Sequence, residues 1–292
     1  MIEFVDVSLG DGPKVRCSRC ATSPEHAAFR SGEEVVAQAA TACEGWDRGT
    51  GPNIRLTGTE PFTHQELPRI VTGVMEAGCR RLAIDTDAVG LRSAQNAHGA
   101  LTAGVRHLRV TFLAGTVGVH DALAGVPGIF DSTRDGVVTY RATADAAQLP
   151  VSVTVAVPVC RHNLRDLPSA VGAAVEVGAD RVEVSVTDGG IDLAAAVPWI
   201  VAACDTGVVN GAWVEVEGMP FCMLPGYDMH LADAIRGRDG SKPRVCGTCP
   251  LDDVCGGAPI GASADQLALL APPPFAAKLA PQVMRARAQG VR

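Results

Sequence analysis

The chain has 292 residues, of which 47% are apolar, 4% aromatic and 20% charged, and its formal net charge at pH 7 is −7. This length suits one large α/β domain with a small appendage. No run of about 18 apolar residues is uninterrupted, so we expect no transmembrane helix, and the first residues lack the pattern of a signal peptide. Nucleic-acid binders usually carry a basic face, and the acidic composition of this chain does not indicate one. We expect a cytoplasmic protein whose partners include neither nucleic acid nor membrane.

The chain opens with a strand pattern and a helix start. Ile2–Leu9 alternates between apolar and polar residues, as a half-buried strand does. Ser31 is followed three residues later by Glu34, which is the pattern of a capping box. These residues predict a strand and then a helix over Glu33–Cys43.

Between residues 50 and 217, short β-branched runs alternate with amphipathic helical patterns. The predicted strands are Asn53–Leu56, Arg81–Asp85, Leu108–Phe112, Val151–Val157, Arg181–Val186 and Trp213–Val216. The predicted helices include His64–Ala77, Leu91–Ala103, Leu164–Val177 and Leu193–Cys204. Three of them are followed by glycine, which accepts the left-handed conformation that ends many helices. These glycines are Gly78, Gly104 and Gly178.

Such alternation predicts parallel strands with right-handed crossovers, in either an open doubly wound sheet or a partial barrel. In a barrel, the chemistry lies at the C-terminal ends of the strands. Three polar stretches fall there, Thr57–Glu60, Asp85–Asp87 and Arg161–Asn163. We therefore expect them to face one shared cavity, and we expect Asn163 to cap a helix.

After residue 217 the periodicity stops. Residues 218–262 are rich in Gly, Pro and Cys, as a metal-ordered segment is. Residues 263–292 predict a short helix, a break at Pro272–Pro274 and a final helix. The expected units are a barrel over 1–217, a Cys-rich segment over 218–262 and a helical tail over 263–292.

Ten cysteines in an expected cytoplasmic chain point to metal or catalysis, because disulfides are disfavoured there. Four cysteines stand singly in apolar patterns and are predicted to be small buried hydrophobes. They are Cys43, Cys79, Cys160 and Cys204.

The late cysteines carry the strongest chemical signal. Cys246–Cys249 is a C-x-x-C turn, which brings two thiolates to one metal or cluster, and Cys255 and Cys222 can complete the set. Four thiolates suit either a [4Fe–4S] cluster or tetrahedral zinc, and the spacing does not choose between them. Lys242 and Arg244 are close enough in sequence to offset thiolate charge.

The segment Gly12–Cys20 resembles the start of a radical S-adenosylmethionine (SAM) domain, whose signature is C-x-x-x-C-x-x-C in a loop after a first strand. Cys17 and Cys20 match its second and third cysteines, and Pro13 stands in place of the first. Proline cannot ligate iron. Taken alone, a C-x-x-C pair also suits a redox pair or half a zinc site.

The stretch Ile54–Pro61 resembles the strand and Gly-Gly-Glu-Pro loop with which this family holds the amino group of SAM, with Thr59 in place of the second glycine. The resemblance implies that Glu60 accepts charge-assisted hydrogen bonds from that ammonium group. Asp85–Asp87 matches a polar strand end near SAM, although a helix-capping loop explains it equally well. The implied cofactor-binding residues are Gly58, Thr59, Glu60, Pro61 and Thr86.

The stretch Met219–Tyr227, with the cysteines that follow it, resembles the auxiliary-cluster region of radical SAM proteins of the SPASM/twitch type. The whole resemblance covers most of residues 1–260. It implies a partial (β/α)6 TIM-like barrel with a small Cys-rich cluster-binding extension, and SAM as a cofactor. It also implies a [4Fe–4S] cluster of the auxiliary type, held by Cys222, Cys246, Cys249 and Cys255. A second, N-terminal cluster would have only Cys17 and Cys20 from this signature.

Three functions follow. The first is a radical SAM enzyme with unusual N-terminal ligation that modifies a peptide or small metabolite, helped by a reductant or partner enzyme. The second is a homologue that no longer cleaves SAM and binds substrate, scaffolds a partner or does other SAM or cluster chemistry. The third is a zinc-stabilised binding module. Glu60 favours an occupied SAM-like pocket, whereas Pro13 favours altered chemistry.

Overall fold

The computed structural model describes residues 4–10, 28–47, 49–187, 189–231 and 240–289. Pro13, Cys17 and Cys20, and with them the predicted N-terminal cluster motif, lie outside the described residues.

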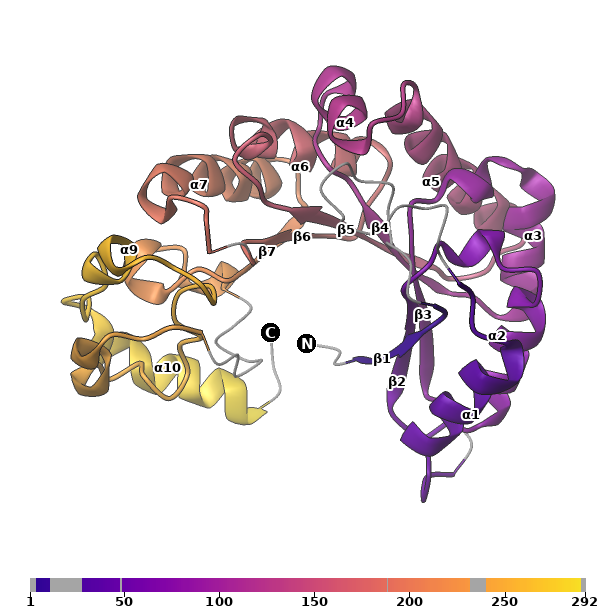
Figure 1. Cartoon of the computed structure of the whole chain (residues 1–292), viewed down its shortest axis with the longest axis horizontal. Coiled ribbons are helices and arrows are strands. Elements are labelled where there is room, and N and C mark those ends of the chain that lie inside the picture. The colour runs from indigo at the N-terminus through magenta and orange to yellow at the C-terminus, as the bar shows by residue number, and fades with distance from the viewer. Residues whose placement is uncertain (1–3, 11–27, 48, 188, 232–239, 290–292) are drawn as a thin grey trace.

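Seven parallel strands form one arched sheet in sequential order (Figure 1). They are β1 (Phe4–Ser8), β2 (Asn53–Thr57), β3 (Arg81–Thr86), β4 (His107–Thr111), β5 (Ser152–Pro158), β6 (Arg181–Ser185) and β7 (Trp213–Glu217). A doubly wound sheet reverses its strand order at a switch point, which this order does not do. Within the described residues the sheet does not close, because β1 and β7 stand at its two ends. The predicted partial barrel is confirmed, with the first predicted strand paired to β2 as β1.

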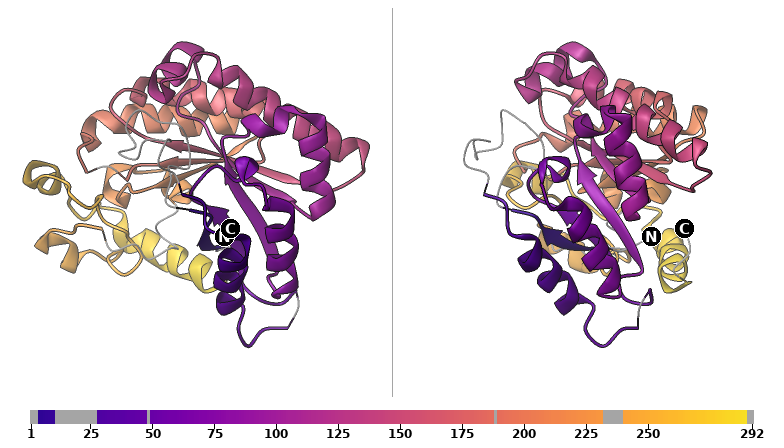
Figure 2. Two further views of the ribbon diagram at one scale, coloured as in Figure 1. Left: turned by 45° about the vertical axis from the view of Figure 1, so that its right-hand side comes forward. Right: turned by 90° about the vertical axis from the view of Figure 1, so that its right-hand side faces the viewer.

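The helices that connect the strands lie on the convex side of the sheet, as Figures 1 and 2 show from three directions. They are α1 (Gly32–Ala42), α2 (Leu67–Glu76), α3 (Ala94–Ala103), α4 (Val117–Ala124), α5 (Ile129–Ala146), α6 (Leu167–Glu176) and α7 (Leu193–Val209). Short 3-10 turns precede some of them: η2 (Pro61–Thr63), η3 (Val89–Arg92) and η4 (Leu164–Asp166). The helices α4 and α5 lie between β4 and β5, where no helix was predicted from the sequence.

Local signals set the helix ends. The Ser31 side chain accepts a hydrogen bond from the Glu34 backbone N–H, and the Glu34 carboxylate accepts one from the Ser31 N–H at 2.8 Å, so the predicted capping box is confirmed. The glycines predicted to follow three helices all have positive φ.

The core lies between the sheet and the helices. Alternate strand residues such as Leu56, Ile84 and Val184 are fully buried there. The four single cysteines, predicted to be buried hydrophobes, are all buried and free.

The chain after β7 has little regular structure. It contains the turns η5 (Phe221–Met223), η6 (Asp228–His230) and η7 (Arg244–Thr248), and the helices α9 (Ala264–Ala268) and α10 (Ala276–Gln289). The predicted proline break lies between these two helices. Apolar side chains of this segment, including Phe221, Leu224 and Leu251, belong to the same core as the barrel. The Gln266 amide also donates a hydrogen bond to the Ile191 carbonyl, before α7.

No helix in the described part of the chain combines the length and the apolar character that a membrane span requires.

Candidate functional site

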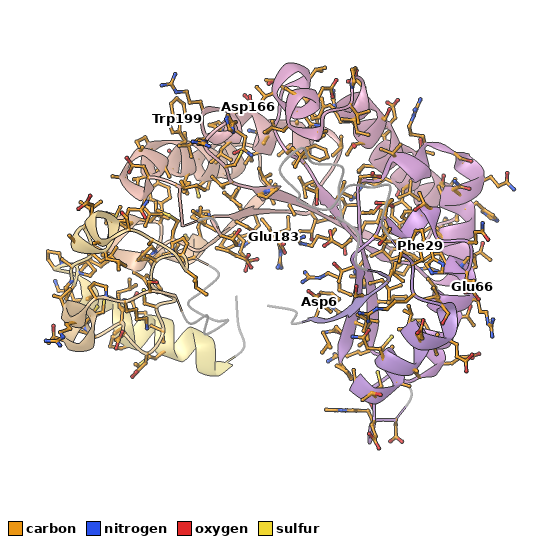
Figure 3. All side chains as sticks on the ribbon, viewed as in Figure 1. Asp6, Phe29, Glu66, Asp166, Glu183 and Trp199 are labelled. Atoms are coloured by element: carbon orange, nitrogen blue, oxygen red, sulfur yellow. The ribbon has the colours of Figure 1, made fainter. Side chains whose placement is uncertain are left out.

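The concave face of the sheet is polar, because every second residue of several strands is polar or charged. The Arg109 Nε on β4 lies 2.7 Å from Glu183 Oε2 on β6, and its Nη1 lies 3.2 Å from Asp85 Oδ2 on β3. Burial opposes the charge on Arg109, but Asp85 and Glu183 outweigh it and raise the pKa of the guanidinium. Asp6 and Glu183 both point to the concave side in Figure 3. One cation thus joins strands across the floor of the barrel.

Further pairs continue this face toward its two ends. Arg55 Nε lies 2.7 Å from Asp6 Oδ1 near the first end. Near the last, Arg181 Nη1 lies 3.1 Å from Glu215 Oε2, and the Ser185 hydroxyl donates to Glu217. These residues were not predicted from the sequence. A parallel strand covered on both faces is apolar throughout. Polar residues at every second position of these otherwise apolar strands were therefore the sequence signal for a polar concave face.

At the C-terminal end of β2 the chain turns sharply at Gly58, whose φ is +99°. A Cβ at this position would lie 2.6 Å from the Gly10 carbonyl oxygen and 2.8 Å from Ser8 Oγ. Only glycine fits both the conformation and the close approach to the end of β1. Thr59 follows and is buried, and Pro61 begins the turn η2.

Glu60 is the centre of this strand-end site. Its carboxylate accepts three hydrogen bonds, from the Phe62 N–H at 3.1 Å, the Thr86 hydroxyl at 2.6 Å and the Asp87 N–H at 2.8 Å. A carboxylate offers about four acceptor positions, so one further donor can be accommodated. The structure therefore brings the Gly58–Pro61 loop and Thr86 together at the ends of β2 and β3.

The proton on Glu60 depends on its surroundings. Burial, and then the neighbouring Asp87 carboxylate, raise the pKa of Glu60 to about 8. Asp87 itself accepts a hydrogen bond from the Val89 N–H at 2.9 Å, although the N-cap of the following turn η3 is Ala88 and no side chain caps it. Two carboxyl groups side by side attract a cation, because a positive charge relieves their mutual repulsion.

Asn163 acts differently from its predicted role. It stands at the N-cap position of η4, but its side chain makes no capping hydrogen bond. The buried amide instead accepts from the Cys160 N–H and donates to the Leu113 and Pro158 carbonyls. The prediction of a helix cap was wrong, because two backbone groups just before Asn163 and the Leu113 carbonyl on a distant loop satisfy this side chain instead of the helix end.

The four late cysteines line one small cavity of about 20 Å³. The remaining lining is largely apolar and includes residues from the segment that follows the cysteines. The cysteine and apolar residues that line the cavity are Cys222, Cys246, Cys249, Cys255, Pro220, Phe221, Leu251, Leu270, Ala271, Pro272 and Pro273. Within the described part of the chain, no three His, Cys, Asp or Glu side chains gather closely enough to hold a single metal ion.

The thiols of this cavity are close enough to influence one another's pKa values. Burial raises the pKa of Cys222, and the neighbouring Cys255 and Cys249 raise it further. Burial is also the main cause of the raised pKa of Cys246, again reinforced by Cys255 and Cys222. Metal ligation requires thiolates, so binding at this cavity would release protons.

Several solved structures have a fold similar to that of this chain. No protein-family model and no curated protein matches the chain. Among solved structures, SuiB from Streptococcus suis bound to precursor peptide SuiA is 13% identical with a TM-score of 0.53, over 73% of this chain and 48% of SuiB. The FeFe-hydrogenase maturase HydG from Carboxydothermus hydrogenoformans is 13% identical with a TM-score of 0.54, over 73% of this chain and 52% of HydG. Methylornithine synthase (PylB) is 13% identical with a TM-score of 0.50, over 77% and 67%.

The chain has the fold of the radical SAM enzymes, to which these three structures belong. It spans about half the length of SuiB and HydG. The family resemblance seen in the sequence is confirmed at the level of the fold, and the SPASM/twitch subgroup stays a prediction.

Proposed function

We propose that this chain is a radical SAM-like iron–sulfur protein that holds a [4Fe–4S] cluster among its four late cysteines and acts on a peptide or small metabolite. The observation that carries the proposal is the single cavity lined by Cys222, Cys246, Cys249 and Cys255. Four thiolates are the usual ligand set of such a cluster.

The apolar lining of the cavity and the radical SAM fold support a cluster over zinc. The apolar lining from Phe221, Leu251 and Leu270 keeps water away, which protects a cluster and tunes its potential. The zinc-stabilised module is therefore the weakest of the three functions.

The strand-end site supports a ligand that carries an amine. Glu60 can accept one more hydrogen bond, and Asp87 adds a second carboxylate beside it. The SAM ammonium group fits this chemistry through a charge-assisted hydrogen bond. When bound, SAM would take one electron from a reduced N-terminal cluster and be cleaved to methionine and a 5′-deoxyadenosyl radical, which would remove a substrate hydrogen. The part of this chain is to hold the amine, aim it along the concave face and exclude water.

The substrate class rests on the fold and on one neighbour. SuiB is solved with a precursor peptide bound and, in another structure, with SAM. The broad polar face from Asp6 to Glu217 offers hydrogen bonds and charges to a peptide or a polar metabolite. A reductant or partner enzyme is required to deliver the electron.

Metal analysis tests the proposal. We expect anaerobic reconstitution to give about four irons per chain for the late cysteines alone, or about eight if the N-terminal motif also holds a cluster. The double variant Cys249→Ser/Cys255→Ser should lose about four irons. Zinc without iron in the reconstituted wild-type protein would overturn the proposal.

A second candidate is a homologue that binds but does not cleave SAM, and Pro13 favours it because only Cys17 and Cys20 remain of the signature. Incubation with SAM, dithionite and a candidate reductant separates the two. Formation of 5′-deoxyadenosine supports the enzyme, and its absence supports the homologue. Cleavage gained only by Pro13→Cys would show that the missing thiolate is the cause.

A further inference from the structure

One ion pair spans the loop that carries three of the four late cysteines. Lys242 precedes Cys246–Cys249, and Asp252 lies between Cys249 and Cys255. The Lys242 Nζ lies 3.1 Å from Asp252 Oδ1 and donates a hydrogen bond of 2.7 Å to the Asp252 carbonyl oxygen. Both side chains line the cysteine cavity.

The backbone around Lys242 fixes where its ammonium group lies. Ser241 and Ala258 exchange backbone hydrogen bonds of 2.8 and 3.0 Å, which ties the chain before the cysteines to the chain after them. A Cβ at Gly257 would lie 2.8 Å from Lys242 Cγ, so the lysine stem packs directly over this glycine. The charge is thus built into the loop rather than carried on a free surface side chain.

The pair is only partly open to water. The side chains of Lys242 and Asp252 are 29% and 36% exposed, so solvent screens their charges incompletely. By contrast, the predicted second cation, Arg244, does not line the cavity. Lys242 is therefore the cation positioned to act on whatever the thiols hold.

We propose that Lys242 and Asp252 set the reduction potential of the C-terminal cluster with opposing signs. The inference rests on the proposed function, because it requires the cluster. Reduction adds one electron from a low-potential one-electron donor, breaks no bond and needs no proton. The added negative charge is stabilised by the Lys242 ammonium and opposed by the Asp252 carboxylate. Both are positioning residues, since they act on the cluster through space.

A redox titration followed by electron paramagnetic resonance tests this, with dithionite as reductant. Cys17→Ala/Cys20→Ala serves as the parent, so that the signal comes from the C-terminal cluster alone. Lys242→Met should shift the midpoint potential lower, and Asp252→Asn should shift it higher. Lys242→Arg keeps the charge and should stay near the parent.

A purely structural pair gives a different result. Both variants would then lose iron or leave the potential unchanged, and either outcome overturns the inference. Should Lys242→Met fail to hold iron, the sign of the Asp252→Asn shift decides alone, with an upward shift in support and any other result against. Iron counts on the same samples separate the two proposals: a loaded parent without opposite shifts sinks only this inference, whereas a parent that takes up no iron sinks the proposed function as well.

Discussion

The strand-end site and the cysteine cavity are built in opposite ways. At the first, Glu60 is held by hydrogen bonds from Phe62, Thr86 and Asp87, on backbone that the sheet fixes. At the second, the thiols sit on short turns, and burial raises the pKa of Cys222 and Cys246. Thiols must lose their protons to bind metal. The sheet thus preorganises the strand-end site, whereas we expect the cysteine loop to depend on a bound metal for part of its order.

The largest expected effect comes from removing two of the proposed metal ligands. In Cys249→Ser/Cys255→Ser we expect limited proteolysis to cut between residues 240 and 262, while the strands of the sheet stay protected, because metal binding is coupled to the folding of such loops. Cys160→Ala is the control, since it removes a buried thiol outside the cavity. A loop that remains as resistant as in the metal-loaded wild type would show that metal does not order it.

A backbone change at the strand-end site comes next. Gly58→Ala should destabilise the protein by about 3 kcal/mol, because the methyl group meets the Gly10 carbonyl and the φ of +99° disfavours alanine. Iron at the late cysteines should be unchanged. Urea denaturation measures the first effect and an iron count the second.

The matched control is Gly99→Ala in α3, where a Cβ would meet nothing within 4 Å. It should stabilise the protein by about 0.5 to 1 kcal/mol, as expected for alanine in a helix. If both alanine variants destabilise equally, the close approach at Gly58 is not the cause.

A third prediction concerns a buried group that belongs to neither site. His120 lies against Phe112 and Phe130, and neither ring nitrogen has a hydrogen-bond partner. Burial lowers the pKa of His120 to about 4. In the unfolded chain it titrates near 6.5, so the stabilisation is complete above that pH and is lost as the pH falls toward 4. At pH 5 the free energy of unfolding is therefore lower by about 2 kcal/mol than at neutral pH.

His120→Phe should remove this acid sensitivity. The difference in unfolding free energy between variant and wild type should grow by about 2 kcal/mol from pH 7.5 to pH 5, measured by urea denaturation at both pH values. A constant difference would mean that His120 finds a partner for its proton.

The smallest expected effect is on ligand affinity at Glu60. Because the pKa of Glu60 is raised to about 8, its negative charge appears as the pH rises through that value. Binding of S-adenosylhomocysteine, which has the amino group of SAM, should tighten several-fold between pH 7 and 8.5 by calorimetry. Glu60→Gln should weaken binding about tenfold, or about 1.4 kcal/mol, and should abolish the pH dependence. Equal tightening in the variant would point to another group.

The order of strands and helices could be predicted from the sequence because strand and helix periodicities are local. The capping box at Ser31 and the C-x-x-C turn at Cys246–Cys249 are local as well. The strand-end site could be predicted only through the family resemblance, since the contact between Glu60 and Thr86 spans 26 residues.

The remaining features depend on contacts that no local pattern contains. One partner of the Asn163 amide, the Leu113 carbonyl, comes from the loop after another strand. Leu270–Pro273 also lines the cysteine cavity, but it lies too far beyond the last cysteine in the sequence for any local pattern to predict this contact. Arg109, Glu183 and Asp85 meet only once the parallel register aligns their strands.

The core shared by the barrel and the Cys-rich segment limits how this segment can be transferred to another protein. Phe221 and Leu224 pack into the same apolar cluster as the sheet, and Gln266 is bonded to the chain before α7. A graft of residues 218–289 onto a foreign barrel would bury these side chains against surfaces that never fitted them. A working chimera would have to carry α7, β7 and the chain just before α7 along with the graft, so its crossover point belongs upstream of Ile191.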